Sequence, residues 1–158
     1  MPITPLHFGI NGTISSISPS KIDTISCILA NVLLDIQPFL VIFFDINIPL
    51  HGISHTLIFA IPACALFFTL YGLLIKKIFH AKKPLSAFIL GGVIGGILHI
   101  TLDSFYHKDV YPFYPFSNMN FATLDSAVET SLFCLIGYIT FIIALIIRFY
   151  LKKVRNSS

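Results

Sequence analysis

Histidine and aspartate residues recur at helical spacing in an otherwise apolar chain. His99 and Asp103 are four residues apart, and His51 and His55 have the same spacing. Residues at positions i and i+4 share one face of an α-helix, so a helix that begins near Pro49 would present both histidines to the same side. Imidazole and carboxylate groups that converge inside a helical bundle are suited to a divalent metal ion.

Further polar residues are expected at the same depth. Asn31 and Asp35 repeat the four-residue spacing, and His7 lies near the start of the first expected helix. Ionisable residues inside membrane segments are costly and usually mark function. We therefore predict a metal centre built from separate helices, with Zn²⁺ as the expected ion and one ion, or two that share a carboxylate, bound there. The predicted metal ligands are His7, Asp35, His51, His55, His99 and Asp103.

A centre of this kind can support hydrolysis. A bound divalent ion lowers the pKa of water from about 16 to about 7 and polarises the attacked phosphoryl or carbonyl oxygen. We predict catalytic roles for Asp103, Asp109 and His107, with Asp109 or an uncoordinated ligand residue as the general base. His107 and Asp109 fall in an expected surface loop, where plain solvation is the alternative interpretation.

The composition places these residues in a membrane protein. Of the 158 residues, 56% are hydrophobic and 11% are charged, against roughly 25% charged in an average soluble domain. We expect a single domain over residues 1–158, folded as an all-α polytopic membrane bundle of about five helices. The net charge is +3, but no basic patch interleaves with aromatic residues, so no nucleic-acid partner is expected. The lipid bilayer is the expected partner.

Three segments are long and apolar enough to cross a bilayer at about 1.5 Å per residue. They are Leu57 to Ile75, Leu85 to Leu102 and Leu132 to Tyr150. Lysines fill the loop between the first two, and basic residues follow the third. By the positive-inside rule both places are cytoplasmic, so the C-terminus is expected in the cytoplasm. The membrane is expected to be the inner or plasma membrane. Most acidic residues then fall at the opposite end of the bundle.

A hairpin of two shorter helices is expected before these spans. Thr4, followed by proline, predicts the start of the first helix, and Ser18, also followed by proline, predicts its end. Ser20, with Asp23 three residues later, predicts the start of the second helix. That helix should stop before Pro38, because proline disfavours helical geometry at the preceding residue.

Residues 39–50 are then too few to cross the membrane, and we expect them at the outer interface or in a re-entrant segment. The alternative is one long helix from Lys21 to about Asp45. It would place Asp35 in mid-membrane and leave the N-terminus loose in the cytoplasm. Both interpretations remain open from the sequence.

Four glycines, at positions 91, 92, 95 and 96, have the small-x-x-x-small spacing of closely packed membrane helices. Close packing is favoured over a phosphate-binding loop. The chain has no phosphate-binding P-loop, no H-E-x-x-H or G-x-S-x-G motif and no dinucleotide fingerprint. Several classes of soluble enzyme are thereby excluded.

Four stretches carry a family resemblance: residues 4–7, 31–38, 51–56 and the run that begins at 99, which together span residues 4–118. There the chain resembles the predicted membrane-bound metal-dependent hydrolases, also described as LexA-binding, inner-membrane-associated hydrolases. The resemblance implies a multi-span membrane protein whose histidines and aspartates bind a metal and support hydrolysis. Gln37 departs from the pattern, because an acidic residue is expected there. The departure weakens the case for a second metal or a carboxylate base at that point.

The leading hypothesis is an integral membrane hydrolase of a phosphoester or lipid-derived ester near the outer membrane face. The aromatic loop after Asp103 would let acyl chains approach, which favours a lipid substrate. A metal-ion or proton carrier that uses the same histidines and aspartates is the alternative. Bis-histidine haem ligation is a third hypothesis, although it leaves the carboxylates unexplained. The sequence sets neither the substrate nor the oligomeric state.

Overall fold

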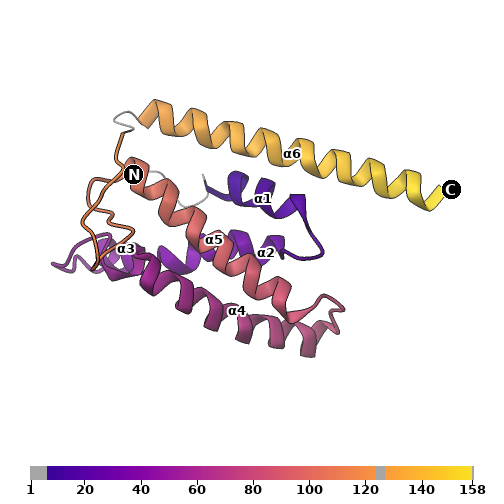
Figure 1. Ribbon diagram of the computed structural model, residues 1–158, viewed down its shortest axis with the longest axis horizontal. Coiled ribbons are helices and arrows are strands. Elements are labelled where there is room, and N and C mark those ends of the chain that lie inside the picture. The colour runs from indigo at the N-terminus through magenta and orange to yellow at the C-terminus, as the bar shows by residue number, and fades with distance from the viewer. Residues whose placement is uncertain (1–6, 124–126, 158) are drawn as a thin grey trace.

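The computed structural model describes residues 7–123 and 127–157. Within these ranges the chain is all-α, which confirms the predicted fold class. Figure 1 shows α6 along one edge of the bundle, α4 along the other, and α1, α2 and α5 between them. The elements are α1 (Phe8–Ile17), α2 (Thr24–Leu34), α3 (Ile36–Phe43), the 3₁₀ helix η2 (Ile53–His55), α4 (Leu57–Phe79), α5 (Leu85–Tyr106) and α6 (Ala127–Ser157).

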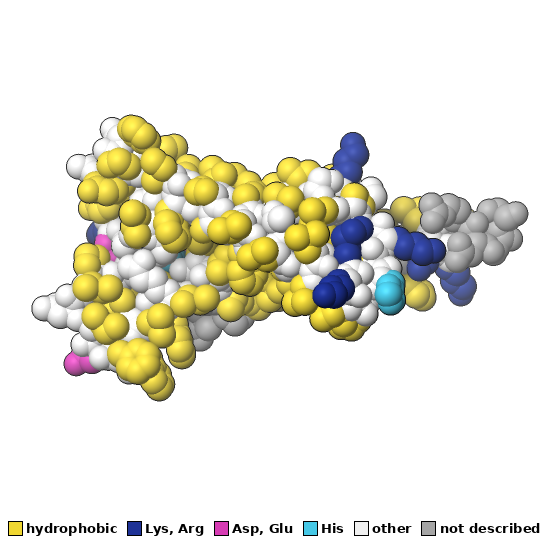
Figure 2. All heavy atoms as spheres, turned by 90° about the horizontal axis from the view of Figure 1, so that it is seen from below, with side chains coloured by type: hydrophobic (Ala, Val, Ile, Leu, Met, Phe, Trp, Pro, Cys, Tyr) yellow, Lys and Arg dark blue, Asp and Glu magenta, His cyan; other side chains and the backbone are white. Residues whose placement is uncertain are grey.

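Four helical stretches are long and apolar enough to cross a membrane: Thr24–Phe43, Leu57–Phe79, Leu85–Tyr106 and Ser131–Val154. The last three contain the predicted spans. Many of their large apolar side chains are exposed, as expected for helices that face lipid. Figure 2 shows most Lys and Arg side chains gathered at one end, here called the basic end, and Asp and Glu at the other, with a hydrophobic surface between them. The predicted segregation of charge is present.

The helical path from Thr24 to Phe43 is interrupted at Asp35, the residue that ends α2 and precedes α3. The prediction that the second helix stops before Pro38 is confirmed, since α2 ends at Leu34, but the chain continues at once into α3, which was not predicted. Because the interruption comes first, Pro38 falls in the first turn of α3, where its missing N–H removes no intrahelical hydrogen bond. Residues 39–43 of the expected interfacial segment are therefore helical, as part of α3.

The long-helix alternative is correct that helical structure continues beyond Pro38, but it lacks the break at Asp35 and is wrong about the N-terminal segment. Helix α1 is packed against both α2 and α6. Gly9 lies against the backbone of Gly137 and Tyr138, and Thr13 Oγ1 is 3.0 Å from Thr140 Oγ1. The predicted hairpin of two short helices is thus present, and it fixes the N-terminal end of α1 within the bundle.

The turn of this hairpin differs from the prediction at one end. Ser18 is the C-cap of α1, as expected, but the N-cap of α2 is Asp23 rather than Ser20. The Asp23 carboxylate accepts hydrogen bonds from Ser26 N (2.9 Å) and Ser26 Oγ (3.0 Å), which satisfies the first turn of the helix. Its other oxygen pairs with Lys83 Nζ at 2.8 Å. The predicted helix start at Thr4 lies outside the described residues.

Helix α5 lies between α2 and α4, and its glycines allow the close approach. Gly91 and Gly95 face the backbone of α2, where a Cβ at Gly95 would meet the carbonyl oxygen of Cys27. Gly92 packs against the ring of Phe68 on α4. The prediction of close helix packing is confirmed. Because α5 packs against α2 on one side and α4 on the other, His99 and Asp103, one to two turns after the glycines, lie near the end of α2 and the start of α4.

Candidate metal centre

Four predicted ligands meet at the end of the bundle opposite the basic end. Asp35 follows α2, His55 lies in η2 directly before α4, and His99 and Asp103 lie one turn apart on α5. One ligand atom from each of the four lies within 4.8 Å of the other three. We call these four residues the central cluster. Three separate segments supply it.

The distances within the central cluster have the dimensions of a metal site. His99 Nε2 lies 3.2 Å from Asp35 Oδ1 and 3.2 Å from Asp103 Oδ2. His55 Nε2 lies 3.5 Å and 3.4 Å from the same two oxygens, and 3.3 Å from His99 Nε2. Ligands held at about 2.0–2.1 Å from a tetrahedral zinc ion are about 3.3–3.4 Å apart. These five separations therefore match edges of a tetrahedron around one ion of that size, and the two carboxylate oxygens lie within 4.8 Å of each other.

Burial makes this cluster costly without a compensating cation. His55 and His99 are each 1% exposed and Asp103 is 3% exposed. In the metal-free protein, burial disfavours the His55 imidazolium, but hydrogen bonds with the Asp103 and Asp35 carboxylates outweigh burial and raise the pKa of His55 to about 9. One proton on His55 offsets only one of the two carboxylate charges. A divalent cation offsets both, so the donor set fits such an ion.

Two neighbouring side chains orient the histidines. Asn31 Nδ2 donates to Ile28 O at 2.8 Å, which turns Asn31 Oδ1 toward His99 Nδ1 at 3.1 Å. Ser54 Oγ and His55 Nδ1 share a hydrogen bond of 3.0 Å. Hydrogen bonds to Nδ1 of this kind fix ring orientation and leave Nε2 as the ligand atom. These roles of Asn31 and Ser54 were not anticipated from the sequence.

His7 lies beside the central cluster rather than among its four ligand atoms. Its Nδ1 is 3.2 Å from His99 Nδ1, and its Nε2 is 3.6 Å from Asp103 Oδ1. That oxygen is not the one that faces His55 and His99, so the Asp103 carboxylate lies between His7 and His55, while His7 contacts His99 directly. His7 is 3% exposed. The geometry gives it contact with Asp103 and His99 from the side of α1.

A second group, the outer cluster, consists of His51, His107 and Asp109, whose ligand atoms also lie within 4.8 Å of one another. His51 Nδ1 is 2.9 Å from Asp109 Oδ2, and the rings of His51 and His107 are 4.3 Å apart. The His51 ring is 4.8 Å from the ring of His55. The outer cluster thus adjoins the central one, and it contains His107 and Asp109, for which the sequence predicts catalytic roles with plain solvation as the alternative.

The predicted helix through His51 and His55 is not formed. His51 lies in a loop, and α4 begins only at Leu57, after the short helix η2. Gly52 breaks the regular path with φ −86° and ψ −142°, and Thr56 is extended before α4. The two histidines therefore do not share a helical face, and each belongs to a different cluster.

The outer cluster connects the buried imidazole of His51 to the protein surface through Asp109. The side chain of His51 is 4% exposed and that of Asp109 is 50% exposed. Partial burial raises the pKa of Asp109, but the hydrogen bond from His51 outweighs it and the net pKa lies below the usual range. Burial, together with the neighbouring His51, lowers the pKa of His107. Near neutral pH the cluster therefore contains a carboxylate and a neutral His107.

Gln37, which stands where the family resemblance leads us to expect an acid, lies outside both clusters. Its Oε1 accepts from Ser54 N at 3.4 Å, and its Nε2 donates to Pro49 O at 3.4 Å. The side chain also packs against Gly52. Gln37 therefore holds the loop that carries the two histidines, and it supplies no carboxylate to either cluster.

The loop after α5 is fixed by similar contacts. Asn120 Nδ2 donates to His107 O at 2.8 Å and to Val110 O at 2.7 Å. Leu57 N, at the start of α4, donates to Pro112 O at 2.9 Å. These bonds hold the segment that carries His107 and Asp109 against the start of α4.

An apolar cavity of about 370 Å³ reaches His7 between α5 and α6. Phe105 and Phe133 are among its lining residues and are 39% and 50% exposed, so its rim lies on the apolar outer surface of the bundle. Tyr106 and Glu129 also line it. The cavity therefore connects the lipid-facing surface with His7, which lies beside the central cluster.

Comparison with known families matches residues 7–156 to the YdjM inner membrane protein family. The match includes every residue of both clusters. Comparisons with curated proteins and with solved structures gave no match. The four apolar helices agree with a membrane protein. Since the match covers nearly the whole chain, the protein belongs to the YdjM inner membrane protein family.

Proposed function

We propose that this protein is an integral membrane metal-dependent hydrolase that acts on a phosphoester or lipid-derived ester near the outer membrane face. The observation that carries the proposal is the convergence of the four ligand atoms in the central cluster, where each histidine Nε2 lies 3.2–3.5 Å from both carboxylates and 3.3 Å from the other Nε2. A bound divalent ion supplies a water of lowered pKa and polarises the attacked oxygen. His55, His99, Asp35 and Asp103 would hold the ion, and Asn31 and Ser54 would orient the two imidazoles.

The outer cluster supplies a route for the proton that hydrolysis releases. His51 lies beside His55 and accepts a proton on the ring nitrogen that does not face Asp109. Asp109 remains a carboxylate because its pKa is lowered, so it stabilises the resulting imidazolium through the 2.9 Å hydrogen bond. Asp109 then takes the Nδ1 proton of His51 transiently, its half-exposed oxygens release that proton to solvent, and its lowered pKa returns it to the carboxylate form. Neutral His107, packed against His51, offers a second acceptor.

A lipid substrate is supported by the cavity beside His7. Its volume of about 370 Å³ lies within the roughly 300–1,000 Å³ range of small-molecule sites. The lining is mainly apolar, and its rim is on the lipid-facing surface. An acyl chain in this cavity would place an ester or phosphoester next to His7 and Asp103.

The carrier hypothesis receives less support from the packing below the site. A carrier needs polar groups along a path through the membrane. On the basic side of the central cluster, α2, α4 and α5 meet in a hydrophobic core that includes Leu34, Cys64 and Phe68, each at most 1% exposed. This apolar packing favours a site that is open toward one face of the membrane, as an enzyme requires, over the path through the membrane that a carrier requires.

The proposal is tested by hydrolysis assays on detergent-purified, zinc-loaded protein with a fluorogenic phosphoester and a fluorogenic phospholipid. Asp35→Asn and His99→Ala should abolish turnover, because each removes a ligand. His80→Ala is the matched control, because His80 ends α4 and belongs to neither cluster. Absence of zinc-dependent turnover in the wild type on both substrates would contradict the proposal.

A further inference from the structure

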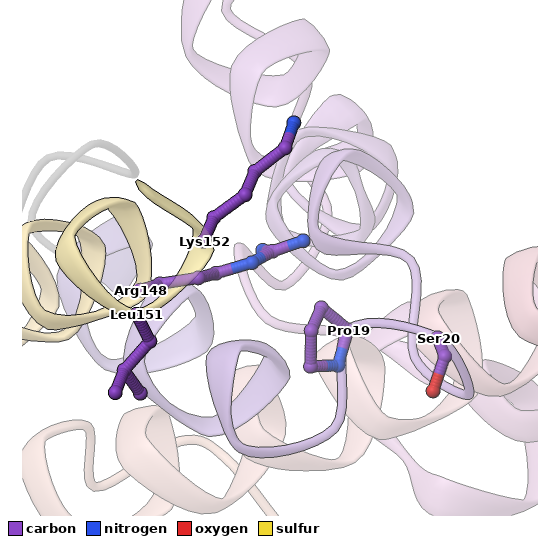
Figure 3. Close-up of a pocket in the computed structure, with 5 residues that line it drawn as sticks. All are labelled: Pro19, Ser20, Arg148, Leu151 and Lys152. Carbon is purple, nitrogen blue, oxygen red and sulfur yellow. The ribbon is translucent and has the colours of Figure 1, made fainter. Parts of the chain in front are cut away.

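A second cavity, of about 500 Å³, lies at the basic end of the bundle, remote from both clusters. The turn between α1 and α2 forms one wall with Pro19 and Ser20, and the last turns of α6 form the other with Arg148, Leu151 and Lys152 (Figure 3). The proposed hydrolysis uses none of these residues. The cavity therefore requires an explanation of its own.

The two basic residues of this cavity act from one side of α6. Arg148 and Lys152 are four residues apart, which places them on the same helical face. Figure 3 shows the Arg148 side chain extended from α6 toward the α1–α2 turn, where Pro19 and Ser20 lie. Within residues 7–123 and 127–157, no carboxylate lies within ion-pair distance of Arg148 or Lys152. Two cations without an acidic partner thus border one cavity.

The position and chemistry of the cavity indicate its ligand. Both cations lie in the last two turns of the membrane-length stretch Ser131–Val154, which is the depth of lipid headgroups. A guanidinium binds phosphate through two parallel hydrogen bonds, and an ammonium adds a point charge. Leu151, 61% exposed, supplies an apolar wall next to them. We infer that this cavity binds the phosphate headgroup of an anionic phospholipid from the leaflet at the basic end.

The bound headgroup would join the C-terminal turns of α6 to the turn between α1 and α2. Helix α6 packs mainly on α1, through contacts such as Gly9 with Gly137 and Thr13 with Thr140. Between Arg148 on α6 and Ser20 in the α1–α2 turn there is the cavity instead. An anionic lipid there holds the end of α6 against the hairpin. Basic pockets between membrane helices bind anionic headgroups in this way.

Native mass spectrometry of the full chain in detergent, with added phosphatidylglycerol or phosphatidylcholine, tests the inference. The wild type should retain one phosphatidylglycerol molecule under conditions that remove phosphatidylcholine. Arg148→Gln with Lys152→Gln should weaken phosphatidylglycerol binding at least tenfold. Lys77→Gln with Lys82→Gln removes the same charge from the basic end but leaves this cavity intact, so it should bind as the wild type does. Equal binding by the first double variant, or equal loss in the second, contradicts the inference.

Two further experiments follow. The first identifies the source of the phosphate, and the second uses only the wild type, so misfolding of a variant cannot affect it. Inorganic phosphate at 10-fold excess over the lipid should not displace phosphatidylglycerol; displacement would assign the cavity to a soluble anion and overturn the lipid assignment. Wild-type protein labelled by a photoreactive phosphatidylglycerol should yield cross-linked peptides that contain residues 17–21 or 148–154. Cross-links confined to other segments would overturn the inference without any variant.

Discussion

His55 Nε2 and His99 Nε2 lie 3.3 Å apart, although 44 residues separate them in the chain. Both nitrogens also face Asp35 and Asp103 at 3.2–3.5 Å. Two imidazole nitrogens with lone pairs repel each other at this distance unless a proton or a cation lies between them. The Asp35 and Asp103 carboxylates face the same space between the two nitrogens, which favours a cation there. Most of the chemistry proposed for this protein follows from this contact.

Removing the hydrogen bond to His99 should weaken the metal site without destroying it. Asn31→Ala leaves all four ligands in place but frees the His99 ring, and loss of such orienting contacts typically costs 10–100-fold in metal affinity. Competition with a chromogenic chelator measures the change. Thr101→Ala, on the exposed side of α5, is the control and should retain wild-type affinity. An unchanged affinity for Asn31→Ala would show that Asn31 does not orient the ligand.

Metal binding should release a proton near neutral pH. The pKa of His55 in the metal-free protein is about 9, so His55 is protonated at pH 7 and must lose its proton to bind the ion. Apparent affinity should therefore rise about tenfold per pH unit up to pH 9 and level off above it. Titration calorimetry in two buffers with different ionisation enthalpies measures the proton. Identical binding heats in both buffers would contradict the prediction.

The outer cluster should affect turnover rather than metal content. Asp109→Asn removes the charge that stabilises protonated His51, and general acid–base contributions are typically about 10²–10⁴-fold in rate. We expect kcat to fall in that range while metal stoichiometry stays at the wild-type value. Lys108→Gln changes a neighbouring exposed charge and should leave kcat within a factor of about two. Loss of metal in Asp109→Asn would instead make Asp109 a ligand.

Close packing of α5 should be sensitive to a single methyl group. A Cβ at Gly95 would meet the carbonyl oxygen of Cys27 and the side chain of Ala30. Gly95→Ala should therefore push α5 from α2 and lower stability by about 1–3 kcal/mol, seen as a reduced thermal midpoint in detergent. Ser86→Ala, on the exposed side of the same helix, should leave the midpoint unchanged. A Gly95→Ala midpoint equal to that of the wild type would contradict the packing argument.

The sequence predicts the α5 part of the site well because one unbroken helix carries it. His99 and Asp103 remain four residues apart on α5, so their spacing alone implies a shared face. The same argument failed for His51 and His55, because Gly52 permits a backbone turn that spacing does not reveal. The grouping of these two histidines depends on loop geometry rather than on periodicity.

The orienting residues were harder to predict, because their partners come from other elements. Asn31 was recognised as sharing a face with Asp35, but its contact with His99 requires the packing of α2 on α5. Ser54 is adjacent to His55, and nothing in its type distinguishes it from other loop serines. The break at Asp35 likewise moved Pro38 into the start of α3, where proline is tolerated.

Metal analysis tests the central claim most directly. Detergent-purified wild-type protein should contain one or two equivalents of a divalent metal by inductively coupled plasma mass spectrometry. His55→Ala and Asp103→Ala should each lose the ion of the central cluster while retaining wild-type helicity, and His80→Ala should retain all of it. Wild-type protein without bound metal, or unchanged metal content in both cluster variants, would contradict the assignment of these residues as ligands.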